Sequence, residues 1–284
     1  MRNPPPSNDS QPQWPDKIHP VPINSGFYYN VLMKVIDLGT LPYRDAWALQ
    51  EQHHDAIVAG GEAVLLLVEH PPVITFGRRD GQQCNLLASQ ETLAEMNVDL
   101  VQSDRGGDVT FHGPGQIVAY PIVRLNNYHL SVGGYVRRLE DIVISTLKQL
   151  KIPAFKDDSA IGVWVNLPGP EYSSGPVNIS AKICALGVRI RKGVSLHGIA
   201  LNVTTDLRYF NLIVPCGLAA RPVTSIQNIL QSAQLPLPMD NHDYGDSIRA
   251  LESASLLKSV RKILINEFQA AFPSATTLPQ DSQP

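Results

Sequence analysis

Short, continuous apolar runs alternate with amphipathic stretches along the first half of the chain. Pro42 is suited to a first helical turn, and apolar residues follow it at helical spacing as far as Val58. A polar-flanked segment, Glu91–Met96, predicts a short helix. The strongest amphipathic pattern begins at Ser131 and predicts a core-packed helix, with an apolar face of Val132, Val136, Leu139, Val143, Leu147 and Leu150. The apolar runs predict strands at Val31–Leu38, Ala63–Glu69, Val73–Phe76, Val98–Gln102 and Ile117–Val123.

The second half begins with a strand pattern at Ile161–Val165. The next segment, Asn166–Val177, contains three prolines and two glycines and predicts a hairpin loop. Thr224 followed by Gln227 fits a capping box that opens a helix, and Ser247–Phe272 carries a long helical pattern. Between them, two apolar runs predict antiparallel strands joined at Arg191-Lys192-Gly193, at Ile179–Ile190 and Ser195–Val203.

This order of elements, without an internal repeat or a central linker, predicts one domain of mixed α and β structure over residues 29–273. Residues 1–28 are rich in Pro, Asn and Ser, and we expect a disordered N-terminal extension. Residues 274–284 are expected to be a frayed tail.

Composition narrows the class of protein. The 284 residues carry 23 Lys and Arg against 26 Asp and Glu, a net charge of −3, so no nucleic-acid footprint is expected. No apolar run approaches the ~20 residues that span a bilayer, so no membrane association is expected. Three cysteines without a visible signal peptide favour a reducing compartment, and we expect a cytoplasmic protein.

A glycine-rich stretch, Asp104–Val123, is the most unusual part of the sequence. Its glycines permit close backbone approach to a ligand, Arg105 offers a rigid donor fork, and His112 titrates near neutrality. A set of bulges and turns is the simpler interpretation. No Gly-Lys-Ser/Thr follows, and a strand rather than a helix follows the glycines, which excludes a Walker loop and a dinucleotide fingerprint.

Two other polar pairs permit a structural or a functional interpretation. Arg78 and Arg79 follow a strand, either as a solvated turn or as a contact for an anionic substrate or carrier. His53 and His54 are interpreted as helix-surface residues, since no Cys, Asp or Glu cluster makes a metal site with them.

The search for catalytic groups leads to thiols. The chain lacks a serine nucleophile elbow, CxxC, HExxH and a paired-carboxylate motif. Cys84 has no obvious activator, and Cys184 lies in a strand pattern where a small core side chain is the simplest interpretation. Cys216, between Pro215 and Gly217, is predicted in an exposed turn that permits nucleophilic attack.

An attacking thiol requires an activator, because the thiolate is the nucleophile. The candidates are His112, His197 and Lys182. Lys182 stands in an otherwise uncharged strand, where it is either an edge-strand solubiliser or a held cation.

Four blocks occur in order: RGGDVTFHGPGQIVAYPI, SAKICALGVRI, SLHGIALNV, and PCGL with VTSI. Together they resemble the lipoyl(octanoyl) transferases, octanoyl-[acyl-carrier-protein]:protein N-octanoyltransferases of the lipoate-protein ligase B type. The resemblance implies an α+β fold with a mixed, largely antiparallel sheet flanked by helices, like the biotin/lipoate-ligase catalytic domain.

The resemblance also implies roles for residues. Cys216 matches the acyl-thioester nucleophile, and Lys182 matches the lysine that lowers the pKa of that thiol and serves as general base. Cys184 departs from the family, where Ala is usual, and as the second residue after Lys182 it is expected to share a strand face with it. The segments implied to line the acyl substrate are Arg105, Gly106, Gly107, Asp108, Val109, Thr110, Phe111, His112, Ala185, Leu186, Gly187, Gly198, Ile199 and Ala200.

The implied reaction moves an octanoyl or lipoyl group from acyl carrier protein to a lysine of a lipoyl domain through a cysteine thioester. The implied partners are octanoyl-acyl carrier protein and the lipoyl domains of 2-oxoacid dehydrogenase E2 subunits and glycine-cleavage H protein. No metal or cofactor is expected, since phosphopantetheine arrives on the carrier protein. The alternatives are an ATP-dependent lipoate- or biotin-protein ligase of the same fold and a non-catalytic acyl-binding protein.

Overall fold

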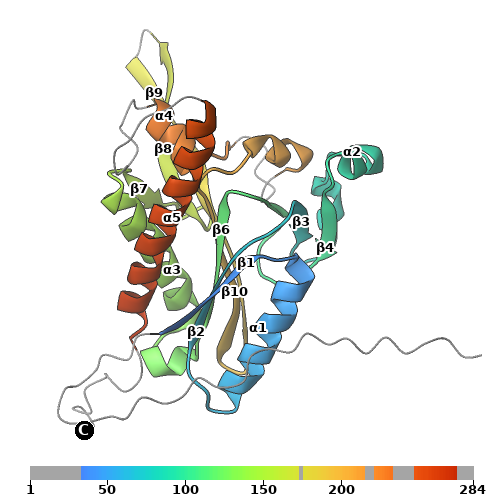
Figure 1. The fold of residues 1–284 in the computed structure, drawn as a ribbon, viewed down its shortest axis with the longest axis vertical. Helices are drawn as coiled ribbons and strands as arrows, with labels where there is room; N and C mark the ends of the chain where they lie inside the picture. The colour runs from blue at the N-terminus through green and yellow to red at the C-terminus, as the bar shows by residue number, and fades with distance from the viewer. Residues whose placement is uncertain (1–32, 173–174, 215–220, 233–245, 274–284) are drawn as a thin grey trace, which may run out of the picture.

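A seven-stranded mixed sheet forms the centre of the computed structural model, which describes residues 33–172, 175–214, 221–232 and 246–273 (Figure 1). Its strand order is β1-β2-β6-β10-β9-β8-β7, with β1 and β2 parallel and every other neighbouring pair antiparallel. The strands are β1 (Lys34–Thr40), β2 (Val64–Glu69), β6 (Gln116–Ile122), β7 (Ala154–Lys156), β8 (Val163–Tyr172), β9 (Gly175–Arg191) and β10 (Val194–Asn202).

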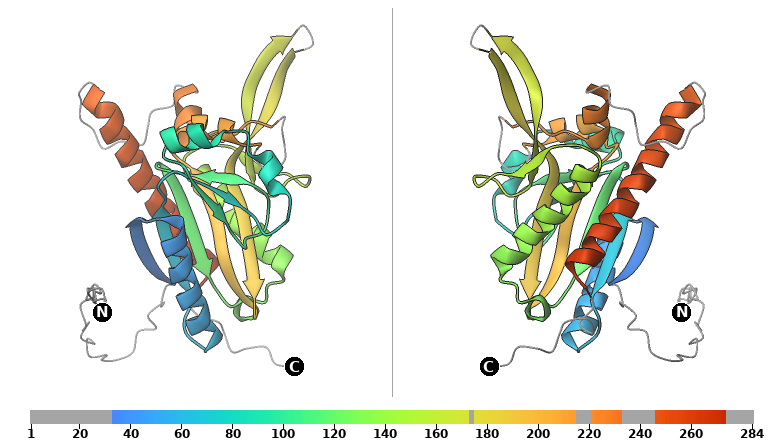
Figure 2. Two further views of the ribbon diagram at one scale, coloured as in Figure 1. Left: turned by 90° about the vertical axis from the view of Figure 1, so that its right-hand side faces the viewer. Right: turned by 90° about the vertical axis from the view of Figure 1, so that its left-hand side faces the viewer.

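Helices cover both faces of this sheet (Figure 2). Helices α3 (Val132–Gln149) and α5 (Asp246–Ala271) pack on one face, and α1 (Tyr43–Val58) packs on the other. Strand β2 shows why its sequence is apolar throughout: Leu65 faces the α3–α5 side and Leu66 faces the α1 side. The predicted α+β class with a largely antiparallel sheet is confirmed.

A three-stranded sheet in the order β4-β3-β5 lies beside the main sheet. Its apolar side chains form a separate cluster with those of the neighbouring short helices. The elements of this part are β3 (Val73–Phe76), η1 (Gln82–Asn85), α2 (Gln90–Glu95), β4 (Asp99–Gln102), β5 (Thr110–His112) and η3 (Leu207–Leu212). Two other short helices, η2 (Leu125–Tyr128) and α4 (Ile226–Ser232), pack in the main core with α3 and α5. Strand β5 lies inside the glycine-rich stretch, where the sequence predicted a loop.

The predicted hairpin loop at Asn166–Val177 is wrong. Strands β8 and β9 continue into this segment as paired backbone, from Pro168 opposite Asn178 to Tyr172 opposite Gly175. The hairpin extends beyond the body of the protein (Figure 2). Prolines are tolerated here because β7 pairs with β8 only at residues 163–165, and the register shifts between Pro168 and Glu171.

Two side-chain predictions also need correction. His54 is not on the surface: it is fully buried, and its Nε2 lies 3.0 Å from the Arg191 carbonyl. Helix α4 is capped by Ser225, whose Oγ accepts from the Asn228 N–H at 3.2 Å, and not by Thr224.

The apolar face of α3 is partly as predicted. Leu139, Val143, Leu147 and Leu150 are buried, whereas Val132 is 53% exposed. Tyr135 and Ile142 are buried as well, so the contact face is rotated relative to the predicted one.

Several predictions lie outside the described residues: the disordered extension at 1–28, the turn at Pro215–Gly217 and the tail at 274–284. The extent of the single domain stays a prediction. Among the described residues, no helix combines the length and apolarity required to cross a membrane.

Candidate active site

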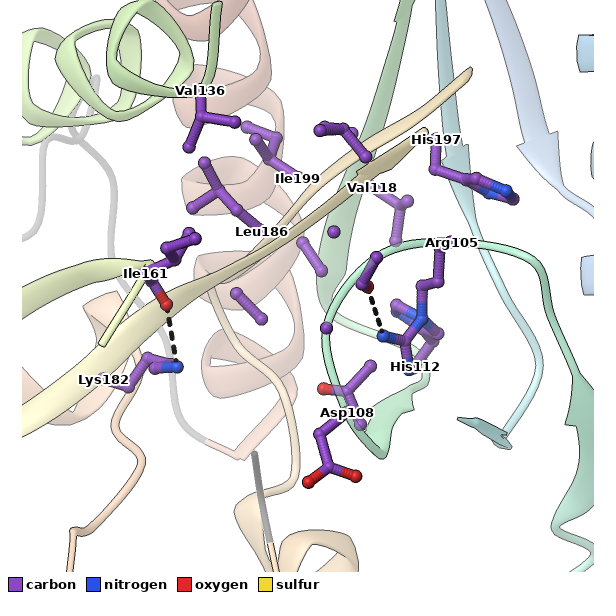
Figure 3. A pocket seen from close by; sticks show the side chains of 18 of the residues that line it. Arg105, Asp108, His112, Val118, Val136, Ile161, Lys182, Leu186, His197 and Ile199 are labelled. Atoms are coloured by element: carbon purple, nitrogen blue, oxygen red, sulfur yellow. Dashed lines mark hydrogen bonds between the residues drawn. The ribbon is translucent and has the colours of Figure 1, made fainter. Parts of the chain in front are cut away.

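A cavity of about 410 Å³ lies against the centre of the large sheet (Figure 3). Three segments far apart in the sequence form much of its wall: the loop between β4 and β5, the middle of β9 and the middle of β10. Val118, Val136, Leu186 and Ile199 lie between its two polar ends (Figure 3). A cavity of this size and character is typical of a small-molecule site.

Most of the residues implied to line the acyl substrate lie on this wall. Val109 and Phe111 are the exceptions, because they alternate with Thr110 and His112 along the strand and point into the cluster of the small sheet. Their role in binding an acyl group stays a prediction. The residues on the wall are Arg105, Gly106, Gly107, Asp108, Thr110, His112, Ala185, Leu186, Gly187, Gly198, Ile199 and Ala200.

Glycine is required where the loop meets β9. The Gly106 N–H donates to the Val188 carbonyl at 3.0 Å. A Cβ on Gly106 would lie 2.8 Å from the Val188 oxygen, and one on Gly187 would lie 2.7 Å from the Gly106 oxygen. The two backbones are therefore in direct contact, and this contact fixes one wall of the cavity.

Lys182 stands at one end of the cavity and is 6% exposed. Its Nζ donates to the Ile161 carbonyl at 3.0 Å and lies 4.8 Å from the ring centre of Trp164. Its backbone pairs with Trp164 of β8 on one side, and its N–H donates to the Pro222 carbonyl on the other at 2.9 Å. Lys182 is thus a held cation rather than an edge-strand solubiliser.

Cys184 does not share the face of Lys182, which corrects the expectation from simple strand alternation. Val163 pairs with Cys184 but Trp164 pairs with Lys182, so Ile183 is an extra residue in β9. Cys184 is fully buried in the core and does not line the cavity. Burial raises the pKa of its thiol, which leaves it protonated and unreactive.

Cys216 lies outside the described residues, but both described ends that flank it are attached to the cavity wall. Before it, the Val214 N–H donates to the Asn85 carbonyl at 2.8 Å, and the Asn85 amide donates to the Asp108 carboxylate. After it, the Arg221 guanidinium lies 3.5 Å from the ring centre of Trp164.

The other end of the cavity is held by hydrogen bonds. Arg105 donates to the Thr75 hydroxyl from Nε at 3.1 Å and to the Thr75 carbonyl from Nη2 at 2.5 Å. His112 lies 3.3 Å from the same hydroxyl through Nε2 and 2.8 Å from Gln116 Oε1 through Nδ1. The guanidinium fork, which the sequence analysis considered for a ligand, is thus bonded to the Thr75 hydroxyl and to the Thr75 and Gly106 carbonyls.

Buried tyrosine and histidine side chains complete this end. The Tyr43 hydroxyl lies 2.9 Å from the Ser103 hydroxyl, and its ring stacks on His112 at 5.7 Å. Burial lowers the pKa of His70 to about 4 and lowers the pKa values of His112 and His197. These imidazoles are therefore uncharged at neutral pH.

His197 adopts a left-handed backbone conformation with φ of 58° inside β10, which is unusual for a buried non-glycine residue. Its N–H donates to Gln50 Oε1 at 2.8 Å. Its Nε2 lies 2.6 Å from the Asp104 carboxylate, so Nε2 carries the proton and Nδ1 accepts from the Tyr43 hydroxyl at 3.4 Å. These bonds hold the ring in one orientation.

The geometry separates the three predicted activators. Figure 3 places His112 and His197 across the cavity from Lys182. Lys182 contacts residues 222–224, which follow the Cys216 stretch. Of the three candidates, Lys182 is therefore the one whose contacts reach the described residues that follow Cys216.

Sequence reasoning missed several wall residues. Tyr43 and Tyr120 belong to elements predicted as core, and the signal was a hydroxyl on an otherwise apolar face. The loop before β8, including Ser159, carried no signal beyond a turn. Arg79 lines the cavity whereas Arg78 does not, and the proposed contact of Arg79 with an anionic group stays a hypothesis. The other wall residues that were missed are Ala160, Ile161, Val118, Val136 and Val188.

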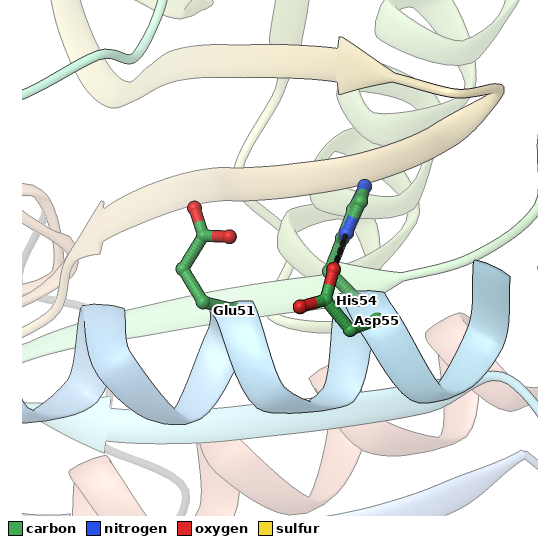
Figure 4. Close-up of side chains that lie close together, drawn as sticks. All are labelled: Glu51, His54 and Asp55. Carbon is green, nitrogen blue, oxygen red and sulfur yellow. Dashed lines mark hydrogen bonds and ion pairs between the residues drawn. The ribbon is translucent and has the colours of Figure 1, made fainter. Parts of the chain in front are cut away.

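One further cluster, Glu51, His54 and Asp55 on α1, brings possible metal ligands together (Figure 4). Arg191 already supplies the positive charge there: its Nη2 contacts the Glu51 carboxylate and lies 3.7 Å from Asp55 and 3.1 Å from His54 Nδ1. The cluster is therefore explained as an ion-pair network that joins α1 to the end of β9.

Comparison with known proteins assigns this fold and site to a family. The sequence model of the lipoyl protein ligase A/B catalytic domain matches residues 42–242. The chain belongs to this family, as the resemblance predicted.

Individual relatives agree with the family assignment. The chain is 47% identical over 203 residues to the octanoyltransferase of Koribacter versatilis, covering 70% of this chain and 76% of that one. It is 41% identical over 212 residues to the octanoyltransferase of Bacteroides thetaiotaomicron, covering 72% and 88%. A crystal structure of lipoate-protein ligase A bound with ATP has a TM-score of 0.56 over 85% of each chain at 16% identity, which shows the shared fold.

Proposed function

We propose that this protein transfers an octanoyl group, or a lipoyl group, from acyl carrier protein to a lysine of a lipoyl domain through a thioester on Cys216. The observation that carries the proposal is Lys182, a held and buried cation at one end of an apolar cavity. The octanoyltransferase relatives support the same reaction.

In the first step the Cys216 thiolate attacks the thioester carbonyl of the octanoyl-carrier protein. The Cys216 sulfur–carbon bond forms, and the carbon–sulfur bond to phosphopantetheine breaks. The Lys182 ammonium favours the thiolate before attack and donates a proton to the departing pantetheine thiolate. One thioester replaces another at nearly equal free energy, so the step needs no ATP.

In the second step a lysine amine of the lipoyl domain attacks the acyl-enzyme. The nitrogen–carbon bond forms, Cys216 departs as a thiolate, and the neutral Lys182 takes the proton from the amine. Lys182 is then an ammonium again, so the proton count closes over one turnover. An amide is more stable than a thioester, which drives this step forward.

The apolar middle of the cavity supplies the binding energy for the acyl chain. It is lined by Val118, Val136, Leu186 and Ile199. Gly106 and Gly187 allow the loop before β5 to lie directly against β9 in the cavity wall. At about 0.8 kcal/mol per buried CH₂, an eight-carbon chain gains enough free energy for selection by length.

Carrier protein and lipoyl domains are the proposed macromolecular partners, and the E2 subunits of 2-oxoacid dehydrogenases and the glycine-cleavage H protein are the proposed sources of those domains. The proposed location is the cytoplasm. No metal or resident cofactor enters the proposed reaction.

The main alternative is an ATP-dependent ligase, since such a ligase shares the fold. Transfer of octanoate from octanoyl-carrier protein to a purified lipoyl domain, measured with and without ATP, separates the two. We expect full transfer without ATP, and loss of transfer in Cys216→Ser.

Cys84→Ser is the matched control, because Cys84 is an exposed free thiol outside the cavity wall. It is expected to keep full activity. A strict requirement for ATP, or undiminished transfer by Cys216→Ser, would overturn the proposal. Absence of any transfer would favour a non-catalytic acyl-binding protein.

A further inference from the structure

Trp164 of β8 lies behind Lys182 and is 1% exposed. Two cations contact its ring: Lys182 Nζ lies 4.8 Å from the ring centre, and Arg221 Cζ lies 3.5 Å from it. Its indole N–H donates to the Ala160 carbonyl at 2.9 Å, which fixes the orientation of the ring. Trp164 is therefore a rigid surface shared by two positive side chains.

Each cation has a second restraint from the loop that leads into β8. The Lys182 ammonium donates to the Ile161 carbonyl, and the Arg221 guanidinium donates to the Asp157 carboxylate at 2.5 Å. Hydrogen bonds from Ser159 and then from Arg221 lower the pKa of Asp157 to about 2, so it is ionised at neutral pH. The loop at 157–162 thus holds both cations against the indole.

A neighbouring glycine shows how closely the lysine stem is packed. Gly162 has φ of 144°, and a Cβ on it would lie 3.0 Å from Lys182 Cε. Its N–H donates to Glu140 Oε1 at 3.2 Å, which attaches the loop to α3. The Lys182 side chain therefore has little freedom to extend toward solvent, as an unrestrained lysine does.

Two like charges on one ring repel each other, so the arrangement requires compensation. The negative face of the indole attracts both cations. Asp157 neutralises Arg221 but makes no ion pair with Lys182. Arg221 is thus paired with an anion of the loop, and Lys182 lies on the cavity wall.

We propose that Trp164 is a positioning residue, whose indole couples the Lys182 ammonium to Arg221 and thereby to the chain that follows Cys216. The inference rests on the proposed function, since it assigns to Lys182 and Cys216 the roles given there. Arg221 is the first described residue after the Cys216 stretch, and its stacking fixes that flank beside Lys182.

The experiment measures the pH midpoint of Cys216 alkylation by iodoacetamide, located by peptide mass, in a Cys84→Ser background. We expect Arg221→Met to raise the midpoint and to lower kcat about tenfold, while KM for octanoyl-carrier protein changes less than twofold. Trp164→Phe keeps a flat ring for both cations and is expected to give a smaller shift.

The decisive arm repeats Arg221→Met in a Lys182→Met background. Because the proposal routes the effect through Lys182, no further shift of the midpoint is expected there. An equal shift in both backgrounds, or no shift in either, would overturn it. Arg208→Met is the matched control: Arg208 pairs with Asp206, its side chain is 85% exposed, and it is not on the cavity wall.

Failure of this inference is distinguishable from failure of the proposed function. If Cys216→Ser still transfers octanoate, the proposed function is wrong. Transfer that is lost in Cys216→Ser, together with an unchanged alkylation midpoint in both Arg221→Met and Trp164→Phe, removes only the role of Trp164.

Discussion

The two ends of the cavity are polar in different ways. At one end, Lys182 is held by the Ile161 carbonyl and the Trp164 ring, and it lines the cavity. At the other end, His112, His197 and Tyr43 are bonded to neighbouring protein groups, and burial holds the pKa values of both histidines below their usual range. At this second end Arg105 also carries a charge, but its guanidinium is bonded to Thr75 and Gly106. One end thus presents a lysine cation to the cavity, and the other presents groups that are fixed by bonds to the protein.

This difference indicates that the lysine end takes part in the chemistry and that the other end gives the cavity its shape. An ammonium beside a thiol changes the reactivity of that thiol, whereas a wall of side chains bonded to the protein contributes shape and rigidity. The strained backbone of His197 fits the second role, because three separate bonds maintain it. We therefore expect variants at the lysine end to change the rate of transfer and variants at the histidine end to change stability.

The largest effect is expected at the charged end. Lys182→Met removes the proposed general base and the cation that favours the thiolate, so kcat should fall by about 10²–10⁴-fold. Octanoyl transfer to a lipoyl domain measures it. Lys156→Met, at a partly exposed lysine paired with Asp141, is the control and is expected to keep full activity. A loss of less than threefold in Lys182→Met would contradict the distinction between the two ends.

Variants at the histidine end are expected to change the free energy of unfolding more than the rate of transfer. His70 has a pKa of about 4 in the folded protein against about 6.5 when unfolded, so the unfolded state binds the proton first. Its contribution is fully present above pH 6.5 and is lost as the pH falls toward 4, up to about 3 kcal/mol.

Denaturant unfolding at several pH values checks this prediction. His70→Asn should be less stable than the parent at pH 7, because bonds to the Leu41 carbonyl and the Tyr120 hydroxyl are lost. Its stability should also depend less on pH between 6.5 and 4. An unchanged slope would show that His70 is not held neutral.

An intermediate effect on stability and substrate binding is expected where the loop at Gly106 contacts strand β9. Gly106→Ala places a Cβ against the Val188 oxygen, so the loop must move away from β9. We expect a cost of about 1–3 kcal/mol in unfolding free energy and a several-fold rise in KM for octanoyl-carrier protein. Gly133→Ala, in α3 with no atom within 4 Å of the new Cβ, should instead gain about 0.5–1 kcal/mol. Equal changes of unfolding free energy and KM in the two variants would show that the contact at Gly106 is not important.

The smallest effect is expected at Cys184. This thiol is buried in the core and is not on the cavity wall, so Cys184→Ala should change the transfer rate less than twofold and stability by about 1 kcal/mol. A large loss of activity would show that the wrong sulfur was assigned to the chemistry.

Much of the fold followed from patterns in the sequence. Continuous apolar runs predicted β2, β3 and β6, because each is buried on both faces, and helical spacing predicted α1, α3 and α5. The β8–β9 hairpin was missed because its prolines suggested a loop, and only the pairing partners show that they lie where β8 has one neighbour. The expectation that Lys182 and Cys184 share a strand face was wrong for a related reason, since a bulge has no clear signature in one strand alone.

The candidate site was predictable only where a motif carried it. The glycine-rich loop, β9 and β10 segments came from ordered blocks that resemble a family, and most of their residues lie on one cavity wall. Trp164 and Tyr43 lie in no such block, and Tyr120 lies in the first block without an assigned role. The positions of Trp164 and Tyr43 depend on contacts between distant elements. His54 was misassigned because helical spacing did not show that β9 supplies a carbonyl partner for it.

The proposed acyl-enzyme can be detected by incubation with octanoyl-acyl carrier protein without a lipoyl domain, followed by digestion and peptide mass mapping. We expect an octanoyl group on the peptide that contains Cys216, absent in Cys216→Ser and slow to form in Lys182→Met. An octanoyl group on Cys184 or Cys84, or transfer to a lipoyl domain with no acyl-enzyme at Cys216, would contradict the proposal.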